Sequence, residues 1–125
     1  MFYNLEDMTR PPTPEVLSRI EEILLLAVWE LGTGAYGVPI RRRVEELLGR
    51  RLSIGSVYVP LDRLVQDGLM TAEVGDPTPV RGGRRKRYYR VTPNGVAALR
   101  ATRRLTRRIW AGKPALLQGT HLPRR

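Results

Sequence analysis

Residues 52–69 read LSIGSVYVPLDRLVQDGL, which is the pattern of an amphipathic helix followed by a turn. Ser53 or Ser56 can cap this helix, and Asp67 and Gly68 end it. Three apolar side chains fall within about 60° of one another on a 3.6-residue wheel, namely Val57, Leu61 and Leu64. The other side presents Gly55, Ser56, Val59, Arg63 and Gln66, with Tyr58 on the flank. The sequence therefore predicts a helix that buries one face and offers the other to a partner.

Two helices are predicted upstream of this stretch. Thr13 can cap the first, in which apolar residues recur at helical spacing as far as Leu31. The second can start near Ala35 or Tyr36 and ends at Gly49. Its inward-facing residues are predicted to be Ile40, Val44, Leu47 and Leu48.

Two strands and one further helix are predicted downstream. The strands cover residues 69–74 and about 87–91, and the Gly- and Pro-rich stretch between them makes a hairpin with a long tip. Thr92 and Pro93 fit the cap and first position of a helix that runs to about Trp110. The fold class is thus mainly α with a two-stranded β-hairpin, in the order of a winged helix-turn-helix domain plus a C-terminal helix.

Charge is strongly segregated along the 125 residues. Residues 77–125 hold 14 of the 22 Lys and Arg side chains and none of the 12 carboxylates. Such a surface repels itself, and a polyanionic partner whose counterions are released on contact is the simplest reason to tolerate it. Nucleic acid is therefore the predicted partner.

Other classes of protein are disfavoured by composition. The chain has no cysteine, which excludes disulfides, thiolate metal sites and thiol nucleophiles and suits a reducing cytoplasm. Its longest apolar run, residues 23–29, is too short to span a bilayer. The only histidine, His121, falls in the predicted tail, and spacing assembles no catalytic or metal-binding constellation. We predict a cytoplasmic protein that is not an enzyme and has no cofactor, no metal site and no membrane partner.

The predicted hairpin tip is the strongest nucleic-acid signal. Residues 81–87 read RGGRRKR and place five cations beside two glycines, which lets the backbone approach a duplex closely. Hydroxyl groups of Ser56 and Tyr58 can bond phosphates or base edges, Val59 can touch a thymine methyl group, and Arg63 can reach a phosphate or guanine. The alternative for the hairpin tip and for this helix is an ordinary polar surface that contacts only water.

The last helix has two unlike sides. Its apolar side carries Ala98, Ala101, Thr102, Leu105 and Ile109, and its basic side carries Arg100, Arg103, Arg104, Arg107 and Arg108. The apolar side either folds back on the first helix or packs against a second copy of the chain, which would match a twofold operator. Trp29 and Trp110 either fill the core, the commoner case, or line an effector pocket.

Taken together, several short stretches resemble the PadR family of transcription regulators, in particular its short members with a single C-terminal helix. The resemblance covers residues 16–110. The stretches that carry it are ILLL at 23–26, AYGV at 35–38, LSIGSVY at 52–58, LDRL at 61–64, DGL at 67–69, GGRRKRYY at 82–89 and VTPNG at 91–95.

The resemblance implies a homodimer that binds an inverted-repeat operator in double-stranded DNA and most often represses transcription. The predicted DNA contacts are Tyr36, Ser53, Ser56, Tyr58, Arg63, Gly83, Arg84, Arg85, Lys86 and Arg87. Of these, the resemblance implies Tyr36, Ser56, Tyr58 and residues 83–86. The implied dimer interface comprises Leu17, Ile20, Leu24, Ala98, Ala101, Thr102, Leu105, Ile109 and Trp110. Some family members release DNA when a small, often aromatic, molecule binds between the helices of the dimer, so a small-molecule effector stays open.

One departure from the family pattern concerns Pro60, which removes the bond from its own position to the Ser56 carbonyl. If the helix starts at Ser56, this loss falls in the first turns and only bends it. A second departure is the short tail, which leaves no room for a large C-terminal sensor domain.

We divide the chain into a flexible N-terminal arm (1–12), a DNA-binding domain (13–92), a dimerisation helix (93–112) and a disordered tail (113–125). The alternative function is a basic RNA-binding or ribosome-associated protein, because winged helices and arginine-rich segments also bind RNA.

Overall fold

A computed structural model describes residues 16–75 and 85–118 of the chain. The helices are α2 (Arg19–Leu31), the 3-10 turn η1 (Gly32–Gly34), α3 (Gly37–Leu48), α4 (Ile54–Gln66), α5 (Pro93–Trp110) and α6 (Pro114–Leu117). The strands β1 (Met70–Val74) and β2 (Arg87–Val91) form one antiparallel hairpin between α4 and α5. The predicted fold class is confirmed. The N-terminal arm, the cap at Thr13, Gly83 and Arg84 at the hairpin tip, and residues 119–125 lie outside the described part.

The first described helix begins later than its hydrophobic pattern predicts. Ser18 is its cap: the Ser18 hydroxyl accepts a bond from the Glu21 backbone N–H (3.2 Å), and Glu21 Oε1 accepts one from the Ser18 N–H (2.8 Å). This capping box satisfies two N–H groups that a helix end leaves unpaired. Val16 and Leu17 therefore precede the helix, although the prediction placed them inside it.

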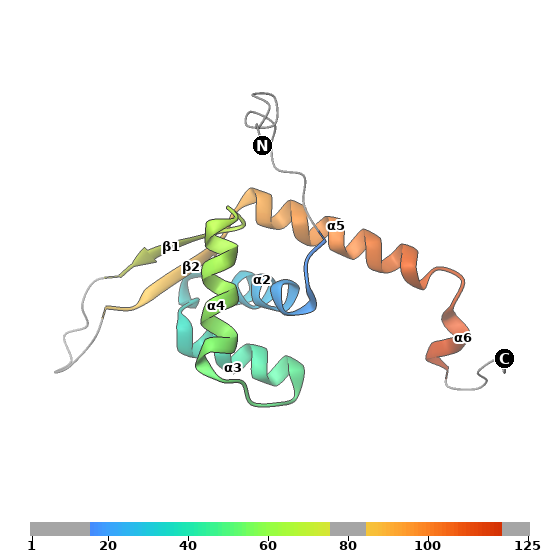
Figure 1. Cartoon of the computed structure of the whole chain (residues 1–125), viewed down its shortest axis with the longest axis horizontal. Coiled ribbons are helices and arrows are strands. Elements are labelled where there is room, and N and C mark those ends of the chain that lie inside the picture. Colours follow the sequence, from blue (N-terminus) through green and yellow to red (C-terminus); the bar gives the residue numbers. More distant parts are fainter. Residues whose placement is uncertain (1–15, 76–84, 119–125) are drawn as a thin grey trace, which may run out of the picture.

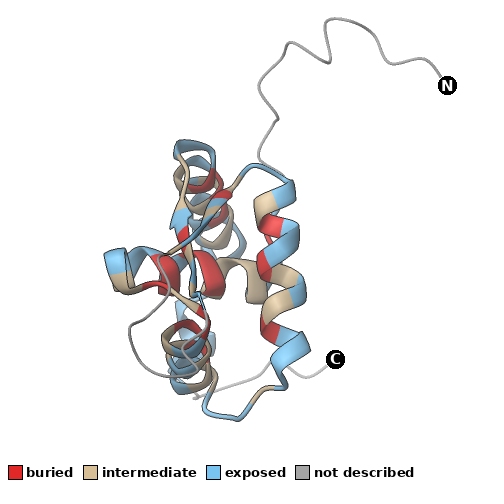
Figure 2. Ribbon diagram, turned by 90° about the vertical axis from the view of Figure 1, so that its left-hand side faces the viewer, coloured by how far each residue is buried: buried red, intermediate tan, exposed pale blue. Residues whose placement is uncertain are grey.

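Helices α2, α3 and α4 and the hairpin surround one core (Figure 2). Its fully buried side chains include Leu24, Leu25, Val28, Ile40, Val44, Val57, Leu61, Leu64 and Met70. All three residues predicted for the inner face of the third helix are among them. Leu47 is a correction, since it is 47% exposed rather than inward-facing. Leu47 shares the face of Ile40 but lies in the last turn of α3, beyond the buried residues Gly37, Ile40 and Val44.

The hairpin is extended by one residue from the start of α3. Tyr36 forms an isolated antiparallel bridge with Tyr88, and the Tyr89 N–H donates to the Ala35 carbonyl (2.8 Å). These contacts hold β2 against the N-terminus of α3, because the Tyr89 N–H finds its hydrogen-bond acceptor there. The hairpin therefore has a defined position relative to the helix-turn-helix.

Helix α5 is tied to the turn between α4 and β1. The Thr92 hydroxyl accepts a bond from the Gly95 N–H (3.1 Å) and donates to the Gly68 carbonyl (2.7 Å), while the Thr92 N–H donates to the Leu69 carbonyl (3.1 Å). Thr92 and Pro93 thus confirm the predicted start of this helix. Gly95 is buried against the same turn.

A methyl group at Gly95 would overlap the Leu69 carbonyl oxygen and come within 2.7 Å of Val91 Cγ1. We expect Gly95→Ala to lower the free energy of unfolding by about 1–3 kcal/mol, because a backbone carbonyl cannot move aside cheaply. The matched control is Gly55→Ala in α4, where an added methyl meets nothing within 4 Å. That change should be neutral or raise stability by up to about 1 kcal/mol. Urea denaturation measures both, and equal stability of the Gly95 variant and the wild type would contradict the close approach.

Beyond its first turns, α5 leaves the body of the domain (Figure 1). Ala98 and Thr102 are buried against the body, whereas Ile109 and Trp110 near the other end are 57% and 41% exposed. Trp29 on α2 is 63% exposed, so neither tryptophan fills the core, contrary to the commoner alternative. The predicted tail contains one helical turn, α6, in its described part.

Residues 16–75 and 85–118 contain no helix with the length and hydropathy that a membrane crossing requires.

Candidate nucleic-acid interface

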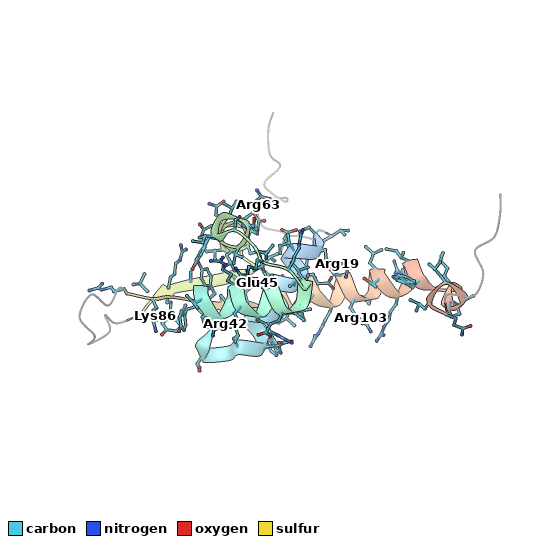
Figure 3. The ribbon with its side chains drawn as sticks, turned by 90° about the horizontal axis from the view of Figure 1, so that it is seen from below. Arg19, Arg42, Glu45, Arg63, Lys86 and Arg103 are labelled. Carbon is cyan, nitrogen blue, oxygen red and sulfur yellow. The ribbon has the colours of Figure 1, made fainter. Side chains whose placement is uncertain are left out.

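The exposed face of α4 is held at its N-terminus by two serines. The Ser53 hydroxyl accepts a bond from the Ser56 N–H (3.2 Å), and the two hydroxyl oxygens lie 2.6 Å apart. Both residues are exposed, as are Val59 and Arg63 further along the same face. Figure 3 shows the Arg63 side chain directed away from the body of the domain. This face therefore offers hydroxyl, apolar and cationic groups in one row.

Pro60 does not interrupt this helix, which begins at Ile54 and continues to Gln66. The Ser56 carbonyl loses its helical donor, but Ser56 is exposed and water can replace the missing bond. The outer face of α4 is thus continuous from Ser53 to Arg63, so a ligand surface can include residues on both sides of the proline.

Tyr58 lies differently from the other predicted contact residues. Its side chain is partly buried, and its hydroxyl and ring edge lie directly against the Gly37 Cα at the start of α3. A Cβ at this position would overlap the Tyr58 side chain, so a larger residue here would displace it. Tyr58 therefore joins the two helices of the helix-turn-helix, with its hydroxyl at the junction rather than on the open face of α4.

Next to the hairpin tip, two tyrosines form an aromatic pair, and a lysine lies over one of their rings. The Tyr36 and Tyr88 rings meet edge to face with centroids 5.6 Å apart, and the Lys86 ammonium lies 4.4 Å from the centre of the Tyr36 ring. A cation over an aromatic face is attracted by the ring quadrupole. The residues that directly follow the hairpin tip are thus held against the start of α3.

A salt bridge joins the hairpin to α4. Arg87 Nη1 lies 3.2 Å from Asp62 Oδ1, and the Arg87 guanidinium also lies 5.4 Å from the centre of the Tyr89 ring. Both charged side chains are about half exposed, so the pair contributes little to overall stability. It links α4 to the start of β2, next to the hairpin tip.

Burial raises the pKa of Tyr89, with smaller contributions from Asp62 and Tyr58, while Arg87 opposes the shift. The unfolded chain ionises first, near pH 10, so it binds fewer protons than the folded chain above that pH. We expect the free energy of unfolding to be unaffected by this group below about pH 10 and to fall as pH rises further. Urea denaturation between about pH 8 and 11 tests this. The loss should be smaller in Tyr89→Phe, and equal losses in both proteins would refute it.

The arginine run in α3 is largely engaged within the domain. Arg43 pairs with Glu30 (2.7 Å) and Glu46 (3.3 Å), and Arg41 lies 3.7 Å from Glu45. Among the ion pairs of the described part of the chain, Arg42 has none, and it is exposed. Two of the three arginines of this run are therefore paired with carboxylates of their own helix.

Glu45 has a second role that the sequence did not indicate. Its Oε2 accepts a bond from the Leu52 backbone N–H (2.7 Å), which ties the end of α3 to the approach of α4. Asp62 and Gly37 were likewise missed as positioning residues. Their partners are 25 and 21 positions away in the chain, so only the fold identifies them.

Most of the predicted DNA contacts lie on two elements that contact each other, α4 and the hairpin. Ser53, Ser56 and Arg63 lie on α4, and Arg85, Lys86 and Arg87 lie where the hairpin tip rejoins β2. Tyr36 and Tyr58 form the junction between these two elements, and Gly83 and Arg84 lie outside the described residues.

The predicted dimer residues divide into two groups. Leu24 and Ala98 have no exposed surface and Thr102 and Leu17 are nearly buried, so these four pack inside the monomer. Their helical spacing could not distinguish an inner face from an interface. Ile20, Ala101 and Leu105 are partly exposed, and Ile109 and Trp110 are exposed. Only this second group is open to a partner.

Residues 25–101 match the PadR-like family of transcriptional regulators, a match that runs from the middle of α2 through α3, α4 and the hairpin to the middle of α5. The chain belongs to this family. Its members are transcription regulators and not enzymes. The PadR-like chain has, in residues 16–75 and 85–118, no cluster of three acidic or histidine side chains that could hold a metal.

Individual relatives agree with the family match. Transcriptional regulator Rv3488 from Mycobacterium tuberculosis is 42% identical over 69 residues, which are 52% of this chain and 61% of that relative, so less than two thirds of its length is matched. A PadR family transcription regulator from Clostridium difficile has the same fold, with a TM-score of 0.62 at 24% identity, covering 80% of this chain and 99% of that one. A transcriptional regulator from Clostridium thermocellum gives 0.57 at 23% identity, covering 75% and 94%.

Proposed function

We propose that this PadR-like regulator binds double-stranded DNA as a homodimer, with the exposed face of α4 in the major groove and the hairpin tip against the backbone. The observation that carries the proposal is the fixed placement of an arginine-rich hairpin beside the row formed by Ser53, Ser56, Val59 and Arg63. Phosphate contacts from the hairpin supply affinity and register, and side chains of α4 read base edges.

The proposed roles differ among the contact residues. Ser53, Ser56 and Arg63 are placed to reach phosphates or bases directly, because their side chains are exposed on α4. Gly83, Arg84, Arg85 and Lys86 are assigned to the wing tip, and Arg87 is assigned to its base with Asp62 as its anchor. Tyr36 and Tyr58 support both elements; the Tyr36 hydroxyl is proposed to meet the DNA backbone at the junction, and the Tyr58 hydroxyl is proposed to reach a base edge.

Dimerisation is proposed through the exposed end of α5. Ala101, Leu105, Ile109 and Trp110 present apolar surface along a helix that has left its own domain. A second copy that packs on this surface would place two α4 helices on one duplex, which requires an inverted-repeat operator. Repression is the proposed sign of regulation, because a dimer bound across promoter DNA obstructs the polymerase. A cytoplasmic location is proposed together with this mode of action.

A small-molecule effector is proposed only as a property of the same interface. Trp110 and its symmetry mate would bring two exposed indoles near the contact between the α5 helices, where an aromatic ligand could stack.

The test is fluorescence anisotropy of the purified protein with the DNA upstream of its own gene, a scrambled duplex and a structured RNA, each at several salt concentrations. Selective binding of the upstream duplex by two protomers, retained at higher salt, is expected. Equal and steeply salt-dependent binding of all three would reduce the interface to a basic surface. A preference for the RNA would favour the alternative of an RNA-binding protein.

Two substitutions separate base reading from backbone contact. Ser56→Ala and Tyr58→Phe should each weaken binding of the upstream duplex, by about 1–3 kcal/mol if the group reads a base, with little change on scrambled DNA. Gly34→Ala is the matched control, since an added methyl there meets nothing within 4 Å and the position is not in the interface. Equal losses on both duplexes would remove the two residues from specificity.

A further inference from the structure

The proposed DNA interface leaves one strongly charged surface unused, the basic side of α5. Five arginines on this helix are exposed, and we call them the α5 arginine stripe: Arg100, Arg103, Arg104, Arg107 and Arg108. The ion pairs of the described part of the chain all involve α2, α3, α4 or β2, so no carboxylate there neutralises the stripe. Self-repulsion along a single helix is unfavourable unless a partner offsets it.

Favourable interactions within the helix explain only part of the stripe. Arg107 and Arg108 lie in the last turn of α5, where cations are stabilised by the helix macrodipole. The effect fades within one turn, so it does not reach Arg100, Arg103 or Arg104. These three need another explanation.

The stripe lies away from the other surfaces of the protein. Arg100, Arg103 and Arg107 lie on the side of the helical wheel opposite Ala98 and Leu105, and Arg104 and Arg108 lie on its flank. A second copy packed on Ala98 and Leu105 would therefore leave at least Arg100, Arg103 and Arg107 open. In Figure 3 the Arg103 side chain lies on the other side of the ribbon from Arg63. A duplex bound along the exposed face of α4 therefore does not cover Arg103 of the same protomer.

The dimensions of the stripe suit a nucleic-acid backbone. Arg100 and Arg108 are eight residues apart, a rise of about 12 Å along the helix. The major groove of B-DNA is about 12 Å wide, so the ends of the stripe can reach phosphates on its two edges. Guanidinium groups bind phosphate oxygens in a bidentate manner, which favours arginine over lysine on such a surface.

We propose that the α5 arginine stripe is a second, sequence-independent binding surface for duplex DNA, so that one dimer can hold two duplexes at once. The proposal rests on the proposed function for the first duplex and for the dimer. The second duplex is bound through its phosphates alone, and its binding is therefore more sensitive to salt than operator binding.

A bridging assay tests this. Upstream duplex is immobilised on beads, wild-type protein is added, and retention of a fluorescent scrambled duplex is measured. The variant is Arg103→Gln, Arg104→Gln and Arg107→Gln, in which glutamine keeps the helix propensity. The charge-matched control is Arg19→Gln, Arg124→Gln and Arg125→Gln. Soluble operator affinity is measured for each protein by anisotropy.

We expect the stripe variant to retain at least about tenfold less scrambled duplex than the wild type or the control, because three phosphate contacts are lost. Its operator affinity should stay within about twofold of the wild type, since the two surfaces are separate. Unchanged retention in the variant would overturn the proposal, because bridging would then come from two recognition helices on different duplexes. Equal loss of operator affinity would also overturn it.

Two further outcomes are distinguishable. A wild-type protein that selects the upstream duplex but retains no second duplex would contradict the stripe and leave the proposed function intact. A protein that shows no selectivity but loses duplex retention in the stripe variant would contradict the proposed function and support the stripe. If structured RNA displaces the fluorescent duplex at much lower concentration than duplex competitor does, the partner is RNA and the assignment to DNA is overturned.

Discussion

Ile109→Glu is expected to convert the regulator from a dimer to a monomer and to weaken binding of its operator by about 100-fold or more, because two linked half-site contacts become one. Ile109 is 57% exposed near the free end of α5, so the folded monomer can accommodate a carboxylate there. In a dimer packed on this surface, the same carboxylate would be buried without a partner, which is strongly unfavourable.

Analytical ultracentrifugation measures the mass, and anisotropy with full and half operators measures the affinity. Ile109→Val is the matched control and should remain dimeric, because it keeps the apolar surface. The thermal unfolding of the glutamate variant, followed at low protein concentration, should stay close to that of the wild type. A glutamate variant that sediments as a dimer would contradict the proposed interface, and one that is monomeric with full operator affinity would contradict the need for two half-sites.

The second large effect is expected at the hairpin tip. Arg84→Ala combined with Arg85→Ala should weaken binding of every duplex and reduce the dependence of affinity on salt. Each lost phosphate contact lowers the slope of log K against log salt by about 0.9, so four contacts per dimer correspond to about 3.6 units. Arg85 is exposed where the hairpin tip rejoins β2, next to Lys86, which is held over Tyr36.

Titration at five or more salt concentrations measures this slope on operator and scrambled duplexes. Arg124→Ala with Arg125→Ala removes the same formal charge from the C-terminus and is the control. A slope equal to that of the wild type would show that the hairpin arginines do not bind phosphate. A loss confined to the operator would instead assign them to base reading, in the way that arginines inserted into a minor groove act.

Much of the fold follows from local patterns in the sequence. The inner face of α4 was correctly predicted as Val57, Leu61 and Leu64, and β2 and α5 were predicted with their observed bounds. These elements have strong local signals, namely a 3.6-residue apolar period or a Thr-Pro start. The start of α2 was predicted wrongly. Val16 and Leu17 fit the helical period of apolar residues, but the capping box at Ser18 starts the helix after them, at Arg19.

The candidate site could be predicted only in part. The sequence shows a cluster of arginines at residues 81–87, and the helical wheel of α4 places Ser56 and Arg63 on its outer face. The sequence could not show that Tyr58 is held against Gly37, or that Asp62 anchors Arg87. These pairs are 21 and 25 residues apart, and no periodicity connects them. For the same reason the wheel of α5 could not separate Ala98, which is buried in the monomer, from Ile109, which is exposed.

The sequence by itself determined the order of helices and strands, the family and the segregation of positive charge, because capping residues, hydrophobic period and composition act over short stretches of chain. Only the tertiary structure decided which exposed residues lie together and which apolar side chains stay open. Those properties depend on contacts between distant segments, such as the Tyr36–Tyr88 bridge and the Asp62–Arg87 pair. The first turns of α5 are held against the domain in the same way, by Gly95 packed against Leu69 and by the hydrogen bond from Thr92 to Gly68.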